Sequence, residues 1–289
     1  MSETTEVVAL IDADVIPYSQ WLRDLVRPLS DSTVGATTGV RWYVPRSRWT
    51  WGTLVRSVWN AMACAQMYVF HIPWAGSMAI RADLFRHHKL LDRWARSFVE
   101  DTATYEFLRS RGLRLQYVPT VTMVNHETVS LGDCFRFIRR QLLCARLYHE
   151  SWPTVATVGL GTPLALTAGF ATALAVDGPA GWGLIAGLGA SLAFYAAGMA
   201  IALSWADRRI NSLARERGSE HYPYSWRSLL AVPLTQVVYL ASLASASFLR
   251  QIEWRGITYQ LEGAGRVRLL GYQPYQRAAH MPAADTSLV

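Results

Sequence analysis

The fold is decided by the stretch Val7-Val8-Ala9-Leu10-Ile11-Asp12-Ala13-Asp14, in which five apolar residues end at two aspartates. Such a run predicts a strand buried on both faces of a sheet. Acidic side chains at the carboxyl end of a buried strand lie where open α/β sheets bind ligands. Because alternate residues of an extended segment point the same way, Asp12 and Asp14 can face one site. Two carboxylates suit a hard divalent ion that also touches a diphosphate, although Asp14 can equally begin a turn or helix before Pro17.

The composition indicates contact with a membrane. Of the 289 residues, 51% are hydrophobic and only 17% are charged, which is unusual for a soluble protein. The net charge is +7, and Lys89 is the one lysine among 28 basic residues. Arginine makes bidentate contacts with phosphate and carboxylate groups, so nucleotide phosphates and lipid headgroups are expected partners. The sequence carries no nucleic-acid-binding module, so we expect no nucleic acid.

Helix and strand patterns alternate over the first 130 residues. Apolar spacing predicts helices, and β-branched or aromatic runs bounded by proline predict strands. The expected helices cover residues 18–29, 53–69 and 102–111, and the expected strands cover residues 34–44, 113–118 and 121–124. Residues 71–81 are expected to form a loop that enters a strand.

Three further positions in this part are candidates for a site. Gly76 and Ser77 precede a strand and let the backbone approach a ligand closely, and Arg81 could reach a phosphate or carboxylate. A tight turn with a surface arginine explains the same residues. Asp101 is placed to cap the helix that follows it or to act as a general base facing the same site as Asp14, and these two roles are compatible.

The second half of the chain is organised around hydrophobic segments. An amphipathic helix is expected over residues 131–149, with arginines that either lie on an anionic bilayer or face the site and hold a diphosphate: Arg136, Arg139, Arg140 and Arg146. Residues 154–176 and 180–205 are long enough to span a bilayer. A basic loop is expected over residues 207–227 and places that side in the cytoplasm. Residues 228–249 form a third apolar segment, which we expect to be re-entrant or interfacial, and residues 252–259 are β-like.

Taken in order, these pieces resemble a membrane-bound family 2 glycosyltransferase of the ceramide glucosyltransferase and hopanoid-glycosyltransferase type. Asp12-Ala13-Asp14 resembles the metal-binding Asp-x-Asp of that family, and Gly76-Ser77-Met78-Ala79-Ile80-Arg81 resembles its acceptor-side segment. Glu100-Asp101 resembles the pair whose aspartate is the catalytic base. The arginine helix occupies the place of the (Gln/Arg)-x-x-Arg-Trp motif, with Arg140 where tryptophan belongs, and Trp254-Arg255-Gly256 resembles the ending of such chains.

The resemblance implies an α/β fold with a partial GT-A, Rossmann-like domain over residues 1–130. An interfacial helix follows over residues 131–150, then a transmembrane region of two or three spans over residues 151–250 and a tail over residues 251–289. Family members carry a βαβ-type nucleotide-binding part before Asp-x-Asp. The resemblance therefore leads us to expect an N-terminally truncated chain that lacks this half or obtains it from a partner chain.

The implied activity is inverting transfer of a hexose, expected to be glucose, from a UDP-linked sugar to the hydroxyl of a ceramide-type or hopanoid-type lipid. Asp101 is the implied base, and Asp14 with Asp12 would hold Mg²⁺ or Mn²⁺. The implied substrate-binding residues are Gly76, Ser77, Arg81, Glu100, Arg136, Arg139 and Arg140. The protein would be a multi-pass protein of the cell membrane with its catalytic part on the cytoplasmic face. An inactive remnant without the donor-binding half and a non-enzymatic membrane scaffold are the alternatives.

Overall fold

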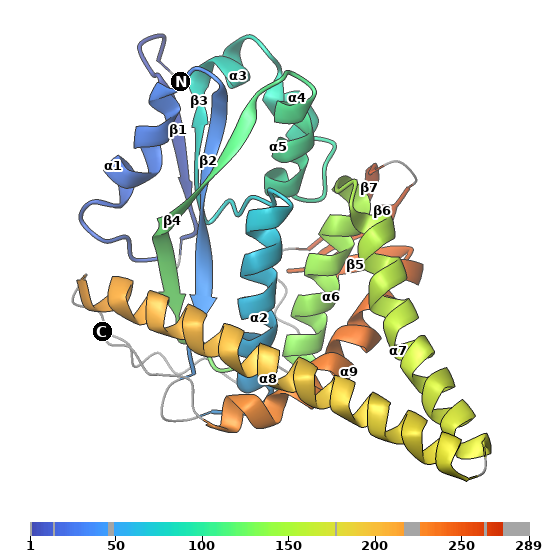
Figure 1. Ribbon diagram of the computed structural model, residues 1–289. Coiled ribbons are helices and arrows are strands. Elements are labelled where there is room, and N and C mark those ends of the chain that lie inside the picture. Colours follow the sequence, from blue (N-terminus) through green and yellow to red (C-terminus); the bar gives the residue numbers. More distant parts are fainter. Residues whose placement is uncertain are drawn as a thin grey trace.

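The computed structural model describes residues 2–13, 15–45, 49–176, 178–216, 226–262 and 265–273 (Figure 1). Its first part contains a mixed four-stranded sheet in the order β1-β3-β2-β4. The strands are β1 (Val7–Ile11), β2 (Val34–Tyr43), β3 (Ser77–Arg81) and β4 (Arg114–Asn125). Strand β3 is antiparallel to β1 and β2, whereas β2 and β4 are parallel. The carboxyl ends of β1, β2 and β4 therefore lie at the same edge of the sheet as the start of β3.

Strand β1 is an edge strand, so the prediction that it is buried on both faces is wrong. Among the described residues it pairs only with β3. Ala9 and Ile11 are exposed, and Ile11 keeps 39% of its surface. A short apolar run cannot by itself indicate how many neighbours its strand has, because pairing depends on segments far away in the sequence.

Helices cover both faces of this sheet (Figure 1). On one face lie α1 (Trp21–Val26) and a 3₁₀ turn η1 (Arg27–Ser30), where Trp21 and Leu25 pack with Ala79 of β3. On the other face Leu84 and Leu108 pack with Met78 of β3. Leu84 belongs to α3 (Ala82–Arg86) and Leu108 to α5 (Glu100–Arg109), and α4 (Leu90–Trp94) lies between these helices in the chain. Adjacent residues of β3 thus point into different cores, as alternation along a strand requires.

Proline accounts for two differences from the predicted elements. The single helix expected over residues 18–29 is a short α-helix followed by η1, which has Pro28 in its first turn. The two strands expected over residues 113–118 and 121–124 are the one strand β4. Its ladder with β2 has an irregularity between Thr38 and Val40, opposite the part of β4 that contains Pro119, so the strand continues past the residue that lacks an N–H donor.

A bundle of long helices is attached to this α/β part. It comprises α2 (Trp51–Val69), α6 (Leu131–Tyr148), α7 (Trp152–Ala175), α8 (Pro179–Glu216) and α9 (Trp226–Phe248). Leu243 of α9 packs with Val55 of α2 and Ile138 of α6. Arg146 of α6 donates to the carbonyl oxygens of Ala246 and Leu249 at 2.7 and 2.8 Å, and so satisfies carbonyls that the end of α9 leaves without intrahelical partners.

A second, three-stranded sheet covers α6. It consists of β5 (Gln251–Trp254), β6 (Ile257–Leu261) and β7 (Val267–Tyr272), all antiparallel. The single β-like segment expected over residues 252–259 is therefore a hairpin. Its turn is Arg255-Gly256, and both residues have positive φ, 52° and 75°, as two-residue hairpin turns of this hand require.

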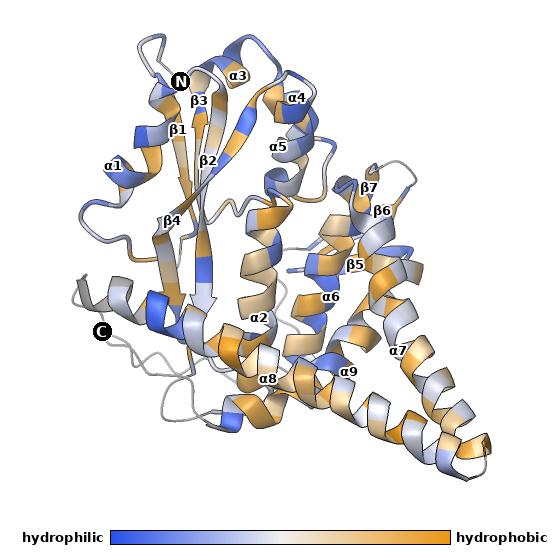
Figure 2. Ribbon diagram, in the orientation of Figure 1, coloured by the Kyte–Doolittle hydropathy of each residue, from blue (hydrophilic) through white to orange (hydrophobic). Residues whose placement is uncertain are grey.

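Three helices, α7, α8 and α9, are long and apolar enough to cross a membrane. In their apolar windows only 6%, 6% and 39% of residues are buried inside the protein. In Figure 2 the ribbon of the α7–α8 hairpin is coloured mostly from white to orange, the colours of apolar residues, and Leu164 and Phe194 expose 70% and 82% of their surface. Side chains of this kind are stable in contact with lipid and costly in water, so the structure indicates membrane association.

Helix α8 continues beyond its apolar part onto the α/β domain. Residues 207–216 are helical, so the loop expected over residues 207–227 is wrong for that portion, and residues 217–225 lie outside the described residues. Ala206 and Ile210 of α8 pack with Val40 and Trp42 of β2. Helix α8 therefore connects the apolar α7–α8 hairpin, called here the apolar arm, to the carboxyl edge of the sheet.

Candidate active site

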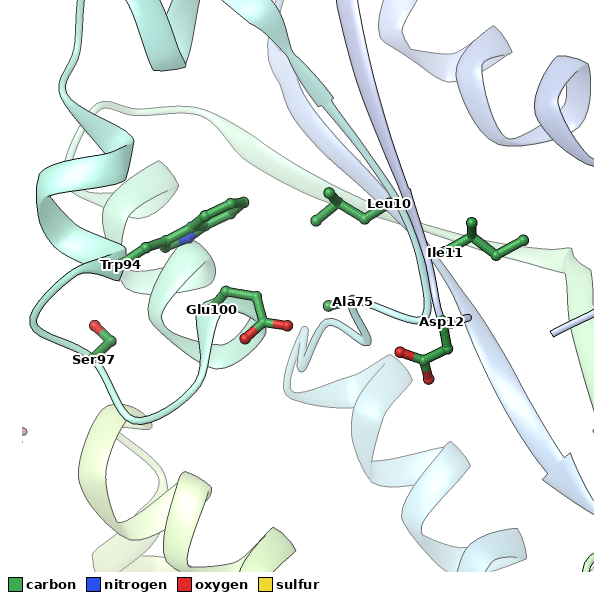
Figure 3. A pocket seen from close by; sticks show the side chains of 7 residues that line it. All are labelled: Leu10, Ile11, Asp12, Ala75, Trp94, Ser97 and Glu100. Atoms are coloured by element: carbon green, nitrogen blue, oxygen red, sulfur yellow. The ribbon is translucent and has the colours of Figure 1, made fainter. Parts of the chain in front are cut away.

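An open acidic pocket of about 410 Å³ lies at the carboxyl edge of β1 (Figure 3). Its walls come from the end of β1, the loop before β3, α4 and the start of α5, with the residues Leu10, Ile11, Asp12, Ala75, Trp94, Ser97 and Glu100. The carboxylates of Asp12 and Glu100 point toward one another across Ala75 (Figure 3). No basic side chain of the described residues forms an ion pair with either. Two carboxylates without an ion-pair partner at an open pocket suit a cation with oxygen ligands.

Gly76 fixes the position of Asp12. The backbone N–H of Asp12 donates to the carbonyl of Gly76 at 3.3 Å. A Cβ added at Gly76 would overlap the ring of Trp74 and Oδ2 of Asp12, so only glycine permits this approach. Gly76 therefore brings two protein groups together, whereas the sequence predicted close approach to a ligand. Asp14, the other predicted metal ligand, lies outside the described residues. Within those residues no group of three His, Cys, Asp or Glu side chains is arranged to hold a metal.

Asp101 is the second residue of α5 and is not its N-cap, a position that Val99 holds. The capping prediction is therefore wrong. Its carboxylate accepts from the N–H and Oγ1 of Thr102 at 2.6 and 3.1 Å, and from the backbone N–H of Ala75. Burial and then the charge of Glu100 raise the pKa of Asp101 to about 6, against these hydrogen bonds. A carboxyl group with this pKa exchanges its proton near neutral pH, as a general base must.

A second, narrower cavity of about 120 Å³ opens beside Asp101. Most of its wall is aromatic or aliphatic. The larger side chains, from β2, α2, the segment between α2 and β3, α6 and α7, include Tyr43, Trp59, Met67, Phe70, Trp74, Phe137, Leu142, Trp152 and Val155. Trp152 and Val155 belong to the first turn of α7. The cavity therefore leads from Asp101 to the beginning of the first apolar helix.

His149 closes one wall of this cavity in a fixed tautomer. Its Nδ1 accepts from the N–H of Ser151 at 3.1 Å, so Nε2 carries the proton that it donates to the carbonyl of Phe70 at 2.7 Å. The ring stacks on Tyr105 of α5 with 5.6 Å between ring centroids. His149 thus links the ends of α2 and α6 to the middle of α5 beside the cavity.

The three predicted arginines of α6 do not act as a group. Arg136 is exposed and pairs with Asp133. Arg139 lies over Phe135 at 5.6 Å and lines neither pocket. Arg140 lies over Trp254 at 4.7 Å and over Phe137 at 5.9 Å. Because Phe137 lines the cavity, Arg140 contacts a residue of the cavity wall but does not itself line the cavity.

Two other predicted residues are not brought to either pocket. Ser77 is fully buried, and its Oγ accepts from the indole N–H of Trp21 at 2.8 Å, so its hydroxyl positions α1. Arg81 lies at the opposite end of β3 and pairs with Asp83 at 3.4 Å. The rest of the predicted set, namely Asp12, Gly76, Glu100, Asp101 and Arg140, lies around the two pockets.

Sequence reasoning missed Arg41. This residue of β2 lines the cavity that Asp101 borders, and its guanidinium lies over the rings of Tyr43 and Trp74 at 4.9 and 5.3 Å. The available signal was a charged residue within a strand whose other residues are all buried.

Comparison with known proteins identifies the family of the chain. A search of curated proteins finds no significant match. In a scan of family models, residues 3–267 match the one described as glycosyl transferase family 21. This range includes both pockets and the three apolar helices. The chain therefore belongs to glycosyl transferase family 21 and is a glycosyltransferase.

Proposed function

We propose that this glycosyltransferase moves glucose from UDP-glucose to the hydroxyl of a membrane lipid, with inversion at the anomeric carbon. The observation that supports the proposal is the position of Asp101. Its carboxylate borders the apolar cavity and is bonded to the N–H of Ala75, which lines the acidic pocket. A base placed between a polar pocket and an apolar cavity can join a nucleotide sugar to a lipid.

The acidic pocket is the proposed donor site. Asp12 and Asp14 would hold Mg²⁺ or Mn²⁺ there, with Glu100 facing the same space. The oxygen ligands offered by Asp12 and Glu100 fit such an ion. When bound, the metal supplies a Lewis acid that neutralises the charge of the departing diphosphate. Arg140, the motif arginine that lies over the cavity-lining Phe137, would add positive charge to the same group.

The apolar cavity is the proposed acceptor site. A lipid whose chains remain among α7, α8 and α9 would place its hydroxyl beside Asp101. The Asp101 carboxylate takes the hydroxyl proton while the oxygen attacks the anomeric carbon from the face opposite the leaving group. The bond from that carbon to the diphosphate oxygen breaks, and its electron pair leaves with UDP. General-base assistance of this kind contributes about 10²- to 10⁴-fold in rate.

The proposed setting is a cell membrane that the chain crosses several times. The arginines of residues 207–227 favour the cytoplasm for the end of α8. The carboxyl edge of the sheet lies beside that end, since Ala206 and Ile210 pack on β2. Both pockets would then open at the cytoplasmic surface, where UDP-sugars are available.

Transfer of label from UDP-[¹⁴C]glucose to a lipid extract tests the proposal directly. We expect the purified protein in nanodiscs to label the organic phase in the presence of Mn²⁺, and chelation with EDTA to stop the reaction. Asp101→Asn should lower the rate at least about 10²-fold, because the base is lost.

The matched control is Glu106→Gln on the same helix. Glu106 pairs with Arg93 at the surface and lines neither pocket, so this variant should label lipid at the rate of the unmodified protein. Label transfer by Asp101→Asn at that same rate would remove the base assignment.

A further inference from the structure

Arg41 presents a charged group to the cavity without a polar partner. Its Nε atom is buried and has no hydrogen bond among the described residues, and no described carboxylate forms an ion pair with it. The contacts of the guanidinium are the faces of Tyr43, Trp74 and Phe137, at 4.9, 5.3 and 5.6 Å. Aromatic faces stabilise the charge, but they use none of the five N–H donors of the group.

Other arginines in the structure show what a purely structural role looks like. Arg56 is bonded to Glu127 at 2.6 Å, and Arg146 donates to two carbonyl oxygens at the end of α9. In each, a terminal N–H group donates to the protein, although Nε of Arg56, like Nε of Arg41, has no hydrogen bond within the part of the chain that the structure describes. A partly buried guanidinium without such hydrogen bonds, as at Arg41, carries a desolvation cost that a ligand can reduce.

The electrostatic surroundings of Arg41 are positive. Arg140 also lies over the ring of Phe137, at 5.9 Å, and its pKa is lowered by burial and also by the charges of Arg41 and Arg255. Arg56, also close to Tyr43, is balanced by Glu127. In the wall of the cavity the one carboxylate is Asp101, and it forms no ion pair with Arg41. The region is thus able to receive a negative group.

We propose that Arg41 is a substrate-binding residue whose guanidinium holds a phosphate or carboxylate oxyanion of a substrate while the reacting hydroxyl lies at Asp101. A planar guanidinium binds either oxyanion through two parallel hydrogen bonds. The inference rests on the proposed function in one respect, namely that this cavity receives a substrate. The oxyanion has two possible sources, which are the diphosphate of the donor and an acidic headgroup of the acceptor lipid.

Binding measurements on the full chain in detergent test this role without requiring turnover. The probes are UDP, which carries the donor diphosphate, and two lipids with identical chains, phosphatidic acid and diacylglycerol, which differ in one phosphate. The variants are Arg41→Gln, Arg41→Lys, and Arg136→Gln as the control, because Arg136 is an exposed arginine paired with Asp133. Thermal unfolding establishes that each variant is folded.

We expect Arg41→Gln to weaken binding of a phosphate-bearing probe at least about tenfold, as loss of a charge-assisted hydrogen bond predicts. Arg41→Lys should recover part of the loss, because it keeps the charge without the two-pronged geometry, and Arg136→Gln should lose nothing. A loss for UDP identifies the donor diphosphate. Unchanged UDP binding, with loss of the preference for phosphatidic acid over diacylglycerol, identifies an acidic acceptor.

The role is overturned if the folded variant binds UDP and phosphatidic acid as the unmodified protein does, or if the unmodified protein binds neither. Should Arg41→Gln fail to fold, Arg41→Lys decides: unchanged affinity for both probes then overturns the role. The outcome is independent of the proposed transfer reaction. Oxyanion binding at Arg41 can be found in a protein that transfers no glucose to lipid, and lipid glucosylation can persist where Arg41 proves inert.

Discussion

The carboxyl group of Asp101 lies beside Ala75 and Cys144, where burial opposes its ionisation. Its pKa rises from the ordinary 3.8 to about 6, so the folded protein holds the proton more tightly than the unfolded chain. Stability is therefore fully retained below pH 4 and falls as pH rises through 6. Above that range the ionised carboxylate costs on the order of 2–3 kcal/mol. The feature that suits a base thus lowers the stability of the protein.

The effect of Asp101→Asn on stability should accordingly be more favourable at pH 8 than at pH 4.5, because the asparagine side chain does not ionise whereas the aspartate of the unmodified protein does. The difference in unfolding midpoint between the variant and the unmodified protein should shift in favour of the variant as pH rises. Thermal unfolding in detergent at the two pH values measures it. A difference that is independent of pH would show that the carboxyl has an ordinary pKa.

Gly76→Ala should damage the acidic pocket. The added Cβ overlaps Trp74 and Asp12, and relief of such crowding costs roughly 1–3 kcal/mol. We expect weaker UDP binding with a folded protein, measured by titration calorimetry. Gly132→Ala is the control, since its Cβ would meet nothing closer than 3.6 Å. Equal affinity in the two variants would contradict the role of Gly76 in positioning Asp12.

At the scale of elements, the long periodic segments were predictable. Strand β2 and helices α2 and α6 agree with the expected ranges to within about two residues, because their own apolar spacing determines them. Around the site, Asp12 and Gly76, which belong to two of the motifs recognised in the sequence, lie in contact in the structure. Arg41 could not be found this way. Its one local signal is a charge within an otherwise buried strand, and its place in the cavity depends on Trp74 and Phe137, which are distant in sequence. The hydroxyl of Ser77 is occupied by the indole N–H of Trp21, which the sequence does not indicate.

Arg146 is the link between α6 and α9 that pattern reasoning treated as one arginine among several. Arg146→Met keeps the apolar stem but removes the hydrogen bonds to Ala246 and Leu249. We expect a loss of about 1.5–3 kcal/mol, observed as a lower unfolding midpoint and faster proteolysis after α9. Arg136→Met, at an exposed position, should change neither, and an unchanged midpoint in Arg146→Met would contradict this role.

At the scale of the whole molecule, α8 is one helix from the apolar arm to the sheet, with Ala206 and Ile210 against β2. Two glycines inserted between Trp205 and Ala206 should interrupt this connection, since glycine weakens a helix interior by about 1 kcal/mol per residue. We expect transfer to lipid acceptors to fall while UDP binding persists. The same insertion after Gly178, in the turn between α7 and α8, should be tolerated. Full lipid transfer by the first variant would show that the connection need not be rigid.

The cavity beside Asp101 ends at the first turn of α7, and this has a consequence for the choice of acceptor. In the proposed arrangement that turn lies at the membrane surface, so the base stands at a set height above the hydrocarbon region. A lipid can present its hydroxyl there only if its headgroup extends from the hydrocarbon region as far as the base. The length of its tails lies within the bilayer and does not affect that distance. Lipids whose chains differ but whose headgroups place the hydroxyl at the same height should then be glycosylated at equal rates.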